Sequence, residues 1–93
     1  MRSETEVFIR EKNARIVDVR TYGEFIGGHV AGSINIPLNE IPARLDELRA
    51  MGPLVLCCAS GGRSFQAAMF LKQQGFQCTD GGSWLNVNHI MNN

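Results

Sequence analysis

Long hydrophobic runs are absent from this chain, and neither sign of charge is in excess. No apolar stretch among the 93 residues approaches the length of about 20 that a membrane-spanning helix needs. The nine basic and nine acidic side chains cancel, so no overall field attracts the chain to nucleic acid or to a membrane surface. Aromatic residues make up only 8% and do not alternate with basic ones, which disfavours binding of single-stranded nucleic acid. We therefore expect neither nucleic acid nor a membrane as a partner.

Cysteine is scarce as well. The chain has three cysteines, two of them adjacent, and it has neither a CxxC pair nor a Cys/His cluster at zinc-site spacing. This pattern makes neither a disulfide framework nor a metal site, and it implies no metal or organic cofactor. The charged stretch at residues 1–13 contains no apolar segment of the kind that a signal peptide requires. These features favour a reducing, cytoplasmic compartment, although a mature periplasmic protein would look the same.

What remains is typical of one small globular domain. A chain of 93 residues with 44% apolar content lies near the small end of what folds around one hydrophobic core. No repeat, linker or low-complexity segment divides it. We predict a single domain over residues 1–93, with its motif-bearing part at about residues 14–82.

Strand and helix patterns alternate along the sequence. The predicted strands cover residues 15–19, 33–36, 54–57 and 76–79. The first is apolar and rich in β-branched residues, and the third is apolar on both faces. The predicted helices cover residues 4–11, 22–26, 64–74 and 83–91, and a further helix begins at an Asn39 cap, carries Pro42 in its first turn and ends at Gly52-Pro53. This alternation indicates a three-layer α/β fold, in which helices cover both faces of a small, mainly parallel sheet of four or five strands.

The same pattern predicts some finer details. In the helix at residues 64–74, we expect the apolar side chains to face the core; they are Phe65, Ala68, Met69 and Leu71. Gly81-Gly82 follows the last predicted strand and is expected to form a turn. Trp84 and Phe76 are expected to belong to the core.

The most informative segment is the hexapeptide Cys58-Ala59-Ser60-Gly61-Gly62-Arg63, which joins a predicted strand to a predicted helix. Ligands of parallel sheets bind beyond the carboxyl ends of the strands. A thiol held there faces backbone N–H groups and the positive end of a helix dipole, and both lower its pKa. Because the thiolate is the nucleophilic form and Arg63 adds a fixed positive charge, we predict that Cys58 and Arg63 are catalytic.

Neighbouring residues are candidates for binding and support. The substrate-binding candidates, which offer loop N–H groups or hydroxyls, are Ala59, Ser60, Gly61, Gly62 and Ser64. Ser60 and Ser64 either donate to the thiolate or cap the following helix. Asp18 ends a buried strand and must be paired, so we assign it and Arg20 a supporting role.

The adjacent cysteines leave a second interpretation open. Counted from Cys57, five residues and then Arg63-Ser64 resemble the loop of protein tyrosine phosphatases, in which the thiolate attacks phosphorus and the arginine binds phosphate oxygens. Counted from Cys58, the loop is narrower and suits a lone sulfur atom. Strand alternation turns Cys57 to the opposite side, into the core, and Leu56 stands where phosphatase loops usually carry histidine. Both observations favour Cys58. Cys78, in an apolar strand, is also expected to be core.

Several motifs occur together in a fixed order: Asp18-Val19-Arg20, Glu24-Phe25, Gly28-His29-Val30, the run at residues 31–38 and the run at residues 53–64. In this order the chain resembles a rhodanese domain. The resemblance implies a sulfurtransferase in which Cys58 takes sulfane sulfur from thiosulfate or a persulfide, becomes a cysteine persulfide, and passes the sulfur to cyanide, a small thiol or a protein thiol. It also implies a structural role for His29.

The resemblance leaves one alternative function open, and the chain departs from the family pattern at one place in the sheet. The rhodanese fold also occurs without activity, so a non-catalytic interaction or sulfur-carrier module is a further possibility. Larger rhodanese domains begin with an additional edge strand, whereas the stretch before Ala14 looks helical here. That difference concerns the sheet edge and not the Cys58 loop.

Overall fold

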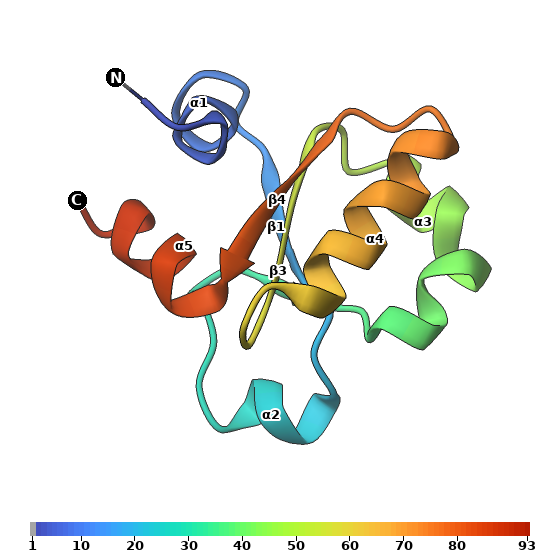
Figure 1. The fold of residues 1–93 in the computed structure, drawn as a ribbon, viewed down its shortest axis with the longest axis horizontal. Coiled ribbons are helices and arrows are strands. Elements are labelled where there is room, and N and C mark those ends of the chain that lie inside the picture. The colour runs from blue at the N-terminus through green and yellow to red at the C-terminus, as the bar shows by residue number, and fades with distance from the viewer. Residues whose placement is uncertain (1) are drawn as a thin grey trace.

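Four parallel strands form the centre of the computed structural model, which describes residues 2–93 (Figure 1). Their order across the sheet is β2-β1-β3-β4. The strands are β1 (Arg15–Asp18), β2 (Ile34–Asn35), β3 (Leu54–Cys58) and β4 (Cys78–Ser83). The predicted α/β class with a parallel sheet is therefore confirmed. Within residues 2–93 no strand precedes β1, because helix α1 (Glu4–Glu11) occupies that stretch as the sequence predicts.

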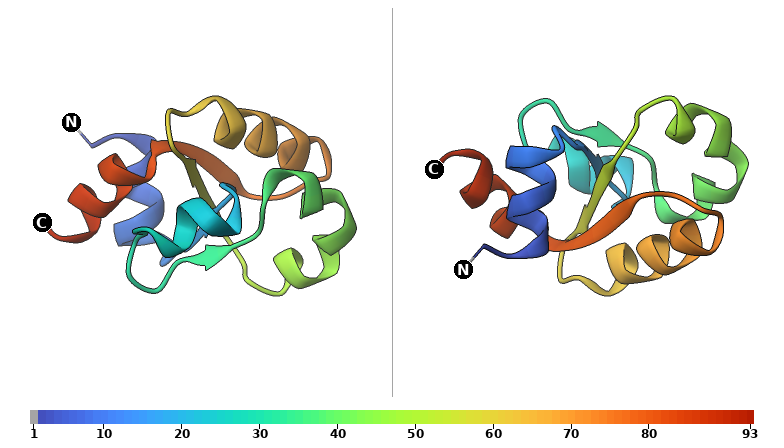
Figure 2. Two further views of the ribbon diagram at one scale, coloured as in Figure 1. Left: turned by 90° about the horizontal axis from the view of Figure 1, so that it is seen from below. Right: turned by 90° about the horizontal axis from the view of Figure 1, so that it is seen from above.

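Helices cover both faces of this sheet (Figure 2). One face carries α1 and α5 (Trp84–Met91), which contribute Phe8 and Val87 to an apolar cluster. The other face carries the 3₁₀ helix η1 (Leu38–Arg44), α3 (Leu45–Arg49) and α4 (Gly62–Gln73). The short helix α2 (Tyr22–Ile26) lies beyond the carboxyl ends of the strands, next to the loop between β3 and α4 (Figure 1).

Strand β3 is central, and all five of its residues are buried. Its side chains alternate between the two faces, as a strand requires. Leu56 and Cys58 belong to the cluster under α4, whereas Val55 and Cys57 belong to the cluster under α1 and α5. The predicted separation of the two adjacent cysteines is thus confirmed.

The predicted inner face of α4 is partly wrong. Phe65 and Met69 are 55% and 47% exposed. The buried residues of α4 are Ser64, Ala67, Ala68 and Leu71, which recur at helical spacing. Three of these four side chains are small, so the helix packs close to the sheet and turns its larger apolar groups outward.

The helix predicted after Asn39 also differs. The 3₁₀ helix η1 begins after Pro37 and has no side-chain cap, so the prediction that Asn39 caps this helix is wrong. Pro42 lies inside η1, where its missing N–H and its ring oppose α-helical hydrogen bonding. The α-helix therefore begins only at Leu45, and the buried apolar side chains come from both parts, as Ile41 and Leu48.

The turn predicted at Gly81-Gly82 is wrong, because both residues lie within β4. A Cβ atom on Gly81 would stand 2.8 Å from methyl groups of Val55 and Val87. Glycine therefore allows close packing here, and the register between β3 and β4 shifts beside it.

No helix within residues 2–93 is long and apolar enough to span a bilayer.

Candidate active site

Cys58 is the last residue of β3, and the chain curls around its sulfur before α4 begins. The N–H groups of Gly61 and Ser64 donate to Cys58 Sγ at 3.0 and 3.3 Å. Gly61 has φ +108°, a left-handed conformation that favours glycine, and it precedes the first residue of α4. The sulfur thus lies at a helix N-terminus, where the sequence places it.

These contacts stabilise the ionised form of Cys58. Burial opposes ionisation, since Cys58 is only 1% exposed. The hydroxyl and N–H of Ser64 and the N–H groups of Gly61 and Arg63 outweigh that penalty and hold the pKa of the Cys58 thiol below its ordinary value. The predicted lowering of the thiol pKa is confirmed, and its causes are local hydrogen bonds.

Ser64 connects Cys58 to a carboxylate that the sequence did not assign to this site. Its Oγ lies 3.3 Å from Cys58 Sγ and donates to Asp80 Oδ1 at 2.6 Å. The N–H of Gly82 donates to the same Asp80 oxygen at 2.9 Å. Because Ser64 has one hydroxyl proton, its donation to a Cys58 thiolate competes with its bond to Asp80. Of the two roles considered for Ser64, the structure places its hydroxyl against the sulfur.

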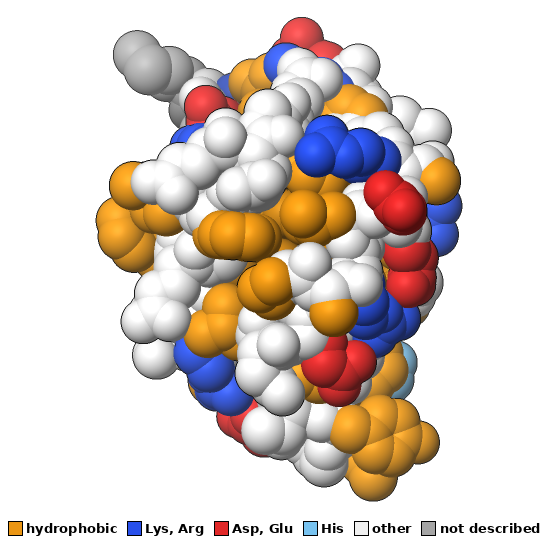
Figure 3. Space-filling model, turned by 90° about the vertical axis from the view of Figure 1, so that its right-hand side faces the viewer, with side chains coloured by type: hydrophobic (Ala, Val, Ile, Leu, Met, Phe, Trp, Pro, Cys, Tyr) orange, Lys and Arg blue, Asp and Glu red, His pale blue; other side chains and the backbone are white. Residues whose placement is uncertain are grey.

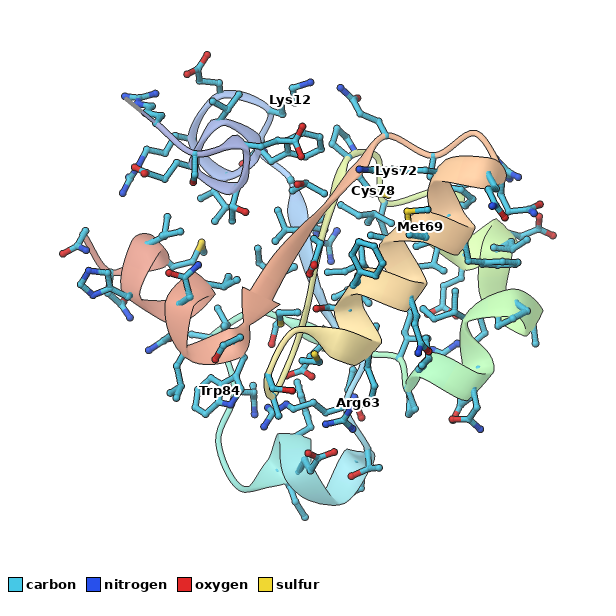
Figure 4. All side chains as sticks on the ribbon, in the orientation of Figure 1. Lys12, Arg63, Met69, Lys72, Cys78 and Trp84 are labelled. Atoms are coloured by element: carbon cyan, nitrogen blue, oxygen red, sulfur yellow. The ribbon has the colours of Figure 1, made fainter. Side chains whose placement is uncertain are left out.

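Arg63 does not direct its guanidinium at the sulfur. Its Nη1 and Nη2 donate to the two carboxylate oxygens of Glu24 on α2, at 2.7 and 3.0 Å. Figure 4 shows Arg63 beside α2. Arg63 therefore has an anionic partner within the chain itself. The guanidinium, together with hydrogen bonds from Thr21, lowers the pKa of Glu24 to about 2.

Asp18 and Arg20 form a buried ion pair at the end of β1. Arg20 Nη2 donates to Asp18 Oδ2 at 2.7 Å and to the backbone oxygen of Gly28 at 2.7 Å. The side chains are 0% and 6% exposed. The Arg20 guanidinium also stacks 4.9 Å from the ring centre of Trp84, which is half-buried. The expected pairing of Asp18 is confirmed, and the pair ties β1 to the segment after α2.

The other candidate nucleophiles lie elsewhere. Burial, together with Asp18, raises the pKa of Cys57 to about 12, so this thiol stays protonated near neutral pH. Cys78 is buried, and burial raises its pKa too.

The remaining residues singled out in the sequence are placed as follows. His29 is hydrogen-bonded through Nδ1 to the backbone oxygen of Phe25 at 2.7 Å, and its ring stacks on the Phe25 ring. Phe76 is partly buried against the core. Ala59, Ser60 and Gly62 form the exposed outer part of the loop, while Gly61 is half-buried.

This loop and this sheet match a known family. The family profile described as "Rhodanese-like domain" covers residues 2–83. The chain belongs to the rhodanese-like domain family. The resemblance seen in the sequence is thereby confirmed. A rhodanese-related protein from Thermoplasma volcanium has the same fold, with a TM-score of 0.76 and 31% identity over 89% of this chain and 83% of that one.

Sequence relatives of this rhodanese-like domain include named sulfurtransferases. The "Uncharacterized protein YqhL" of Bacillus subtilis (strain 168) is 41% identical over 74% of this chain and 53% of its own length. A "Sulfurtransferase" of Allochromatium vinosum is 38% identical over 66% of this chain and 57% of its length. A "Thiosulfate sulfurtransferase GlpE" of Pseudomonas aeruginosa (strain LESB58) is 35% identical over 80% of this chain and 70% of its own length. The chain spans about half the length of the first two relatives.

Sequence reasoning missed two carboxylates of this rhodanese-like site. The site residues that the sequence predicts include neither Asp80 nor Glu24. Asp80 could have been found because it directly follows the strand predicted at residues 76–79, and the observed strand, β4, lies next to β3. Glu24 carried a local signal, because Thr21 and Glu24 have the spacing of a capping box, which the structure contains. Within residues 2–93 no cluster of three or more His, Cys, Asp or Glu side chains is arranged for a metal ion.

Ser64→Ala is expected to shift the pH profile of Cys58 alkylation by iodoacetamide to higher pH. The variant removes a donor that lowers the pKa of Cys58, so the thiolate fraction near pH 7 falls. We expect the alkylation rate there to fall roughly fivefold, the equivalent of about 1 kcal/mol for one hydrogen bond. Ser60→Ala is the matched control, because Ser60 is exposed and should leave the profile unchanged. An unshifted profile in Ser64→Ala would show that the hydroxyl donates to Asp80 or to the Gly61 carbonyl and not to the sulfur.

Proposed function

We propose that this rhodanese-like domain is a sulfurtransferase that carries sulfane sulfur as a persulfide on Cys58. The observation that supports it most is the hydrogen bonding of Cys58 Sγ by the N–H groups of Gly61 and Ser64. Those donors stabilise a sulfur anion, which is both the attacking group and the leaving group of sulfur transfer. Cys58 is 1% exposed, and so tight a cradle suits one added sulfur atom better than a phosphate with its several oxygens.

The reaction has two displacements at sulfur. The Cys58 thiolate attacks the outer sulfur of a donor such as thiosulfate or a persulfide, the Sγ–S bond forms, and the donor's S–S bond breaks. Sulfite or a thiolate leaves with the electron pair. An acceptor, which is cyanide in an assay or a thiol, then attacks the outer sulfur of the persulfide and regenerates the Cys58 thiolate. In this scheme Arg63, bound to Glu24, holds the loop beside α2, while the loop N–H groups contact the sulfur.

Intact-mass measurement tests the loading step. After incubation with thiosulfate or cysteine persulfide, we expect an adduct of one sulfur atom, and peptide mapping should locate it on Cys58. Cyanide should remove the adduct and yield an equivalent amount of thiocyanate. Persistent absence of the adduct with both donors, or its location on Cys57, would contradict the proposal. An adduct that forms but is not released to cyanide or to thiols would indicate a sulfur carrier without transferase activity.

A further inference from the structure

Carboxylates outnumber guanidinium groups around the Cys58 loop. Three carboxylates, from Asp18, Glu24 and Asp80, and two guanidinium groups, from Arg20 and Arg63, lie at this end of the sheet. Both arginines are used in bidentate contacts with carboxylates. Asp80 accepts from Ser64 and Gly82, and within residues 2–93 it has no cationic partner. The site therefore offers an approaching ligand no uncompensated positive side chain.

The pair of Glu24 and Arg63 is built to persist. Glu24 Oε1 also accepts from the N–H and the hydroxyl of Thr21, at 3.0 and 3.1 Å, which fixes the carboxylate before Arg63 binds it. The guanidinium stays charged, and Glu24, with its lowered pKa, stays ionised near neutral pH. Both side chains are 36% exposed, so the pair lies at the mouth of the site, where an incoming donor meets it.

Donors of sulfane sulfur differ in the charge next to the transferred atom. Thiosulfate is a dianion whose sulfonate group is bonded directly to the outer sulfur. An organic persulfide carries at most one negative charge, on its ionisable outer sulfur, and it donates sulfur in its neutral form R–S–SH. A dianion that approaches the Cys58 thiolate needs a cation to offset repulsion, and the geometry commits both candidate cations to Asp18 and Glu24.

An apolar side chain next to the loop favours the same class of donor. Phe65, in the first turn of α4, is 55% exposed. Met69, one turn further along α4 and away from the loop, is 47% exposed. Figure 3, a view from the side of α3 and α4, shows hydrophobic side chains gathered on this face between charged ones. An organic substituent on a persulfide gains contact with such a surface, whereas sulfite has nothing apolar to bury.

We propose that Glu24, by neutralising Arg63, makes this site select low-charge organic persulfides over thiosulfate as the sulfur donor. The inference rests on the proposed sulfurtransferase function and specifies its donor. In the favoured step the Cys58 thiolate attacks the outer sulfur of R–S–SH, the Sγ–S bond forms, and R–S⁻ leaves with the electron pair of the broken S–S bond. The proton stays on the transferred sulfur, and no oxidant or reductant is needed.

Glu24→Gln tests this selection. Glutamine keeps an oxygen for the Thr21 hydrogen bonds but removes the negative charge, which frees the charge of Arg63 for an anionic donor. The donors are thiosulfate, a dianion, and methanethiosulfonate, a monoanion in which methyl replaces one charged oxygen, each with cyanide as acceptor. We expect kcat/KM for thiosulfate to rise about tenfold relative to that for methanethiosulfonate, the equivalent of about 1.4 kcal/mol, and added salt to reduce the gain.

Glu47→Gln is the matched control. Glu47 on α3 also binds an arginine through two hydrogen bonds, from Arg44 at 2.9 Å each, so the variant makes the same change in net charge outside the loop. We expect its ratio of kcat/KM for the two donors to equal that of the wild type. Equal ratios in Glu24→Gln and the wild type would overturn the role of Glu24.

The wild-type protein tests the donor class independently. We expect cysteine persulfide to load Cys58 with a larger second-order rate constant than thiosulfate, as measured by intact mass. Faster loading by thiosulfate would overturn the inference while leaving the sulfurtransferase proposal intact. Failure of every donor to load Cys58 would instead overturn the proposed function itself.

Discussion

Cys58→Ser is expected to abolish sulfur loading and to lower the rate of thiocyanate formation at least roughly a thousandfold, as loss of a covalent nucleophile does. Serine keeps the size and the hydrogen-bonding position of the side chain, so the loop can retain its shape. Its hydroxyl, however, is almost wholly protonated near neutral pH and forms no persulfide. The measurements are intact mass after incubation with each donor and steady-state thiocyanate release.

Cys57→Ala provides the comparison for this experiment. Cys57 is buried on the opposite face of β3, among Phe8, Val55 and Val87, and its pKa is raised to about 12. We expect Cys57→Ala to keep the wild-type loading of one sulfur and to lose only the modest stability of a small cavity. If Cys57→Ala lost the activity and Cys58→Ser kept it, the loop would have to be counted from Cys57, as in the phosphatase interpretation.

The strands and the helix start that position this site can be predicted well from the sequence, because they depend on local patterns. Short apolar runs predict β1 and β3 closely, and the glycine-bearing loop after Cys58 predicts where α4 begins. In a parallel sheet, all strands point their carboxyl ends the same way, so Asp18 and Cys58 necessarily share one edge. Strand alternation is equally local, and it separates Cys57 from Cys58.

Contacts between distant segments explain what the sequence does not predict. Arg63 meets Glu24, 39 positions away, only because α2 lies across the end of the sheet. Asp80 reaches Ser64 only because β4 pairs with β3. The inner face of α4 is set by how closely the helix packs on β3 and β4, so small residues face inward and Phe65 is exposed. Hydrophobicity alone does not carry that information.

The electrostatic design of the site separates two kinds of ion pair. The pair of Arg63 and Glu24 is partly exposed, so one of its charges can be removed by substitution without unfolding the domain. The pair of Arg20 and Asp18 is buried, and Asn35 donates to the backbone oxygens of both residues. The first pair is therefore suited to tune which donor binds, and the second to hold the strand ends on which the loop rests.

Asp18→Ala is expected to lower the free energy of unfolding by about 3–5 kcal/mol, because it leaves a guanidinium buried without its counter-charge. Arg20 keeps only the Gly28 carbonyl and the face of Trp84 as partners. Urea unfolding followed by circular dichroism measures the loss. Glu11→Ala is the control, since its pair with Arg2 is more than half exposed, at 57% and 53%, and should cost less than about 1 kcal/mol.

The double variant Asp18→Ala, Arg20→Met separates an unpaired charge from lost packing. Methionine removes the charge but fills part of the space beside Trp84, so we expect the double variant to be more stable than Asp18→Ala alone. If the stability losses of Asp18→Ala and Arg20→Met simply added up in the double variant, the cost of Asp18→Ala would come from packing and not from the buried charge. A loss below about 1 kcal/mol in Asp18→Ala would show that water reaches Arg20, and the pair would then behave like a surface ion pair.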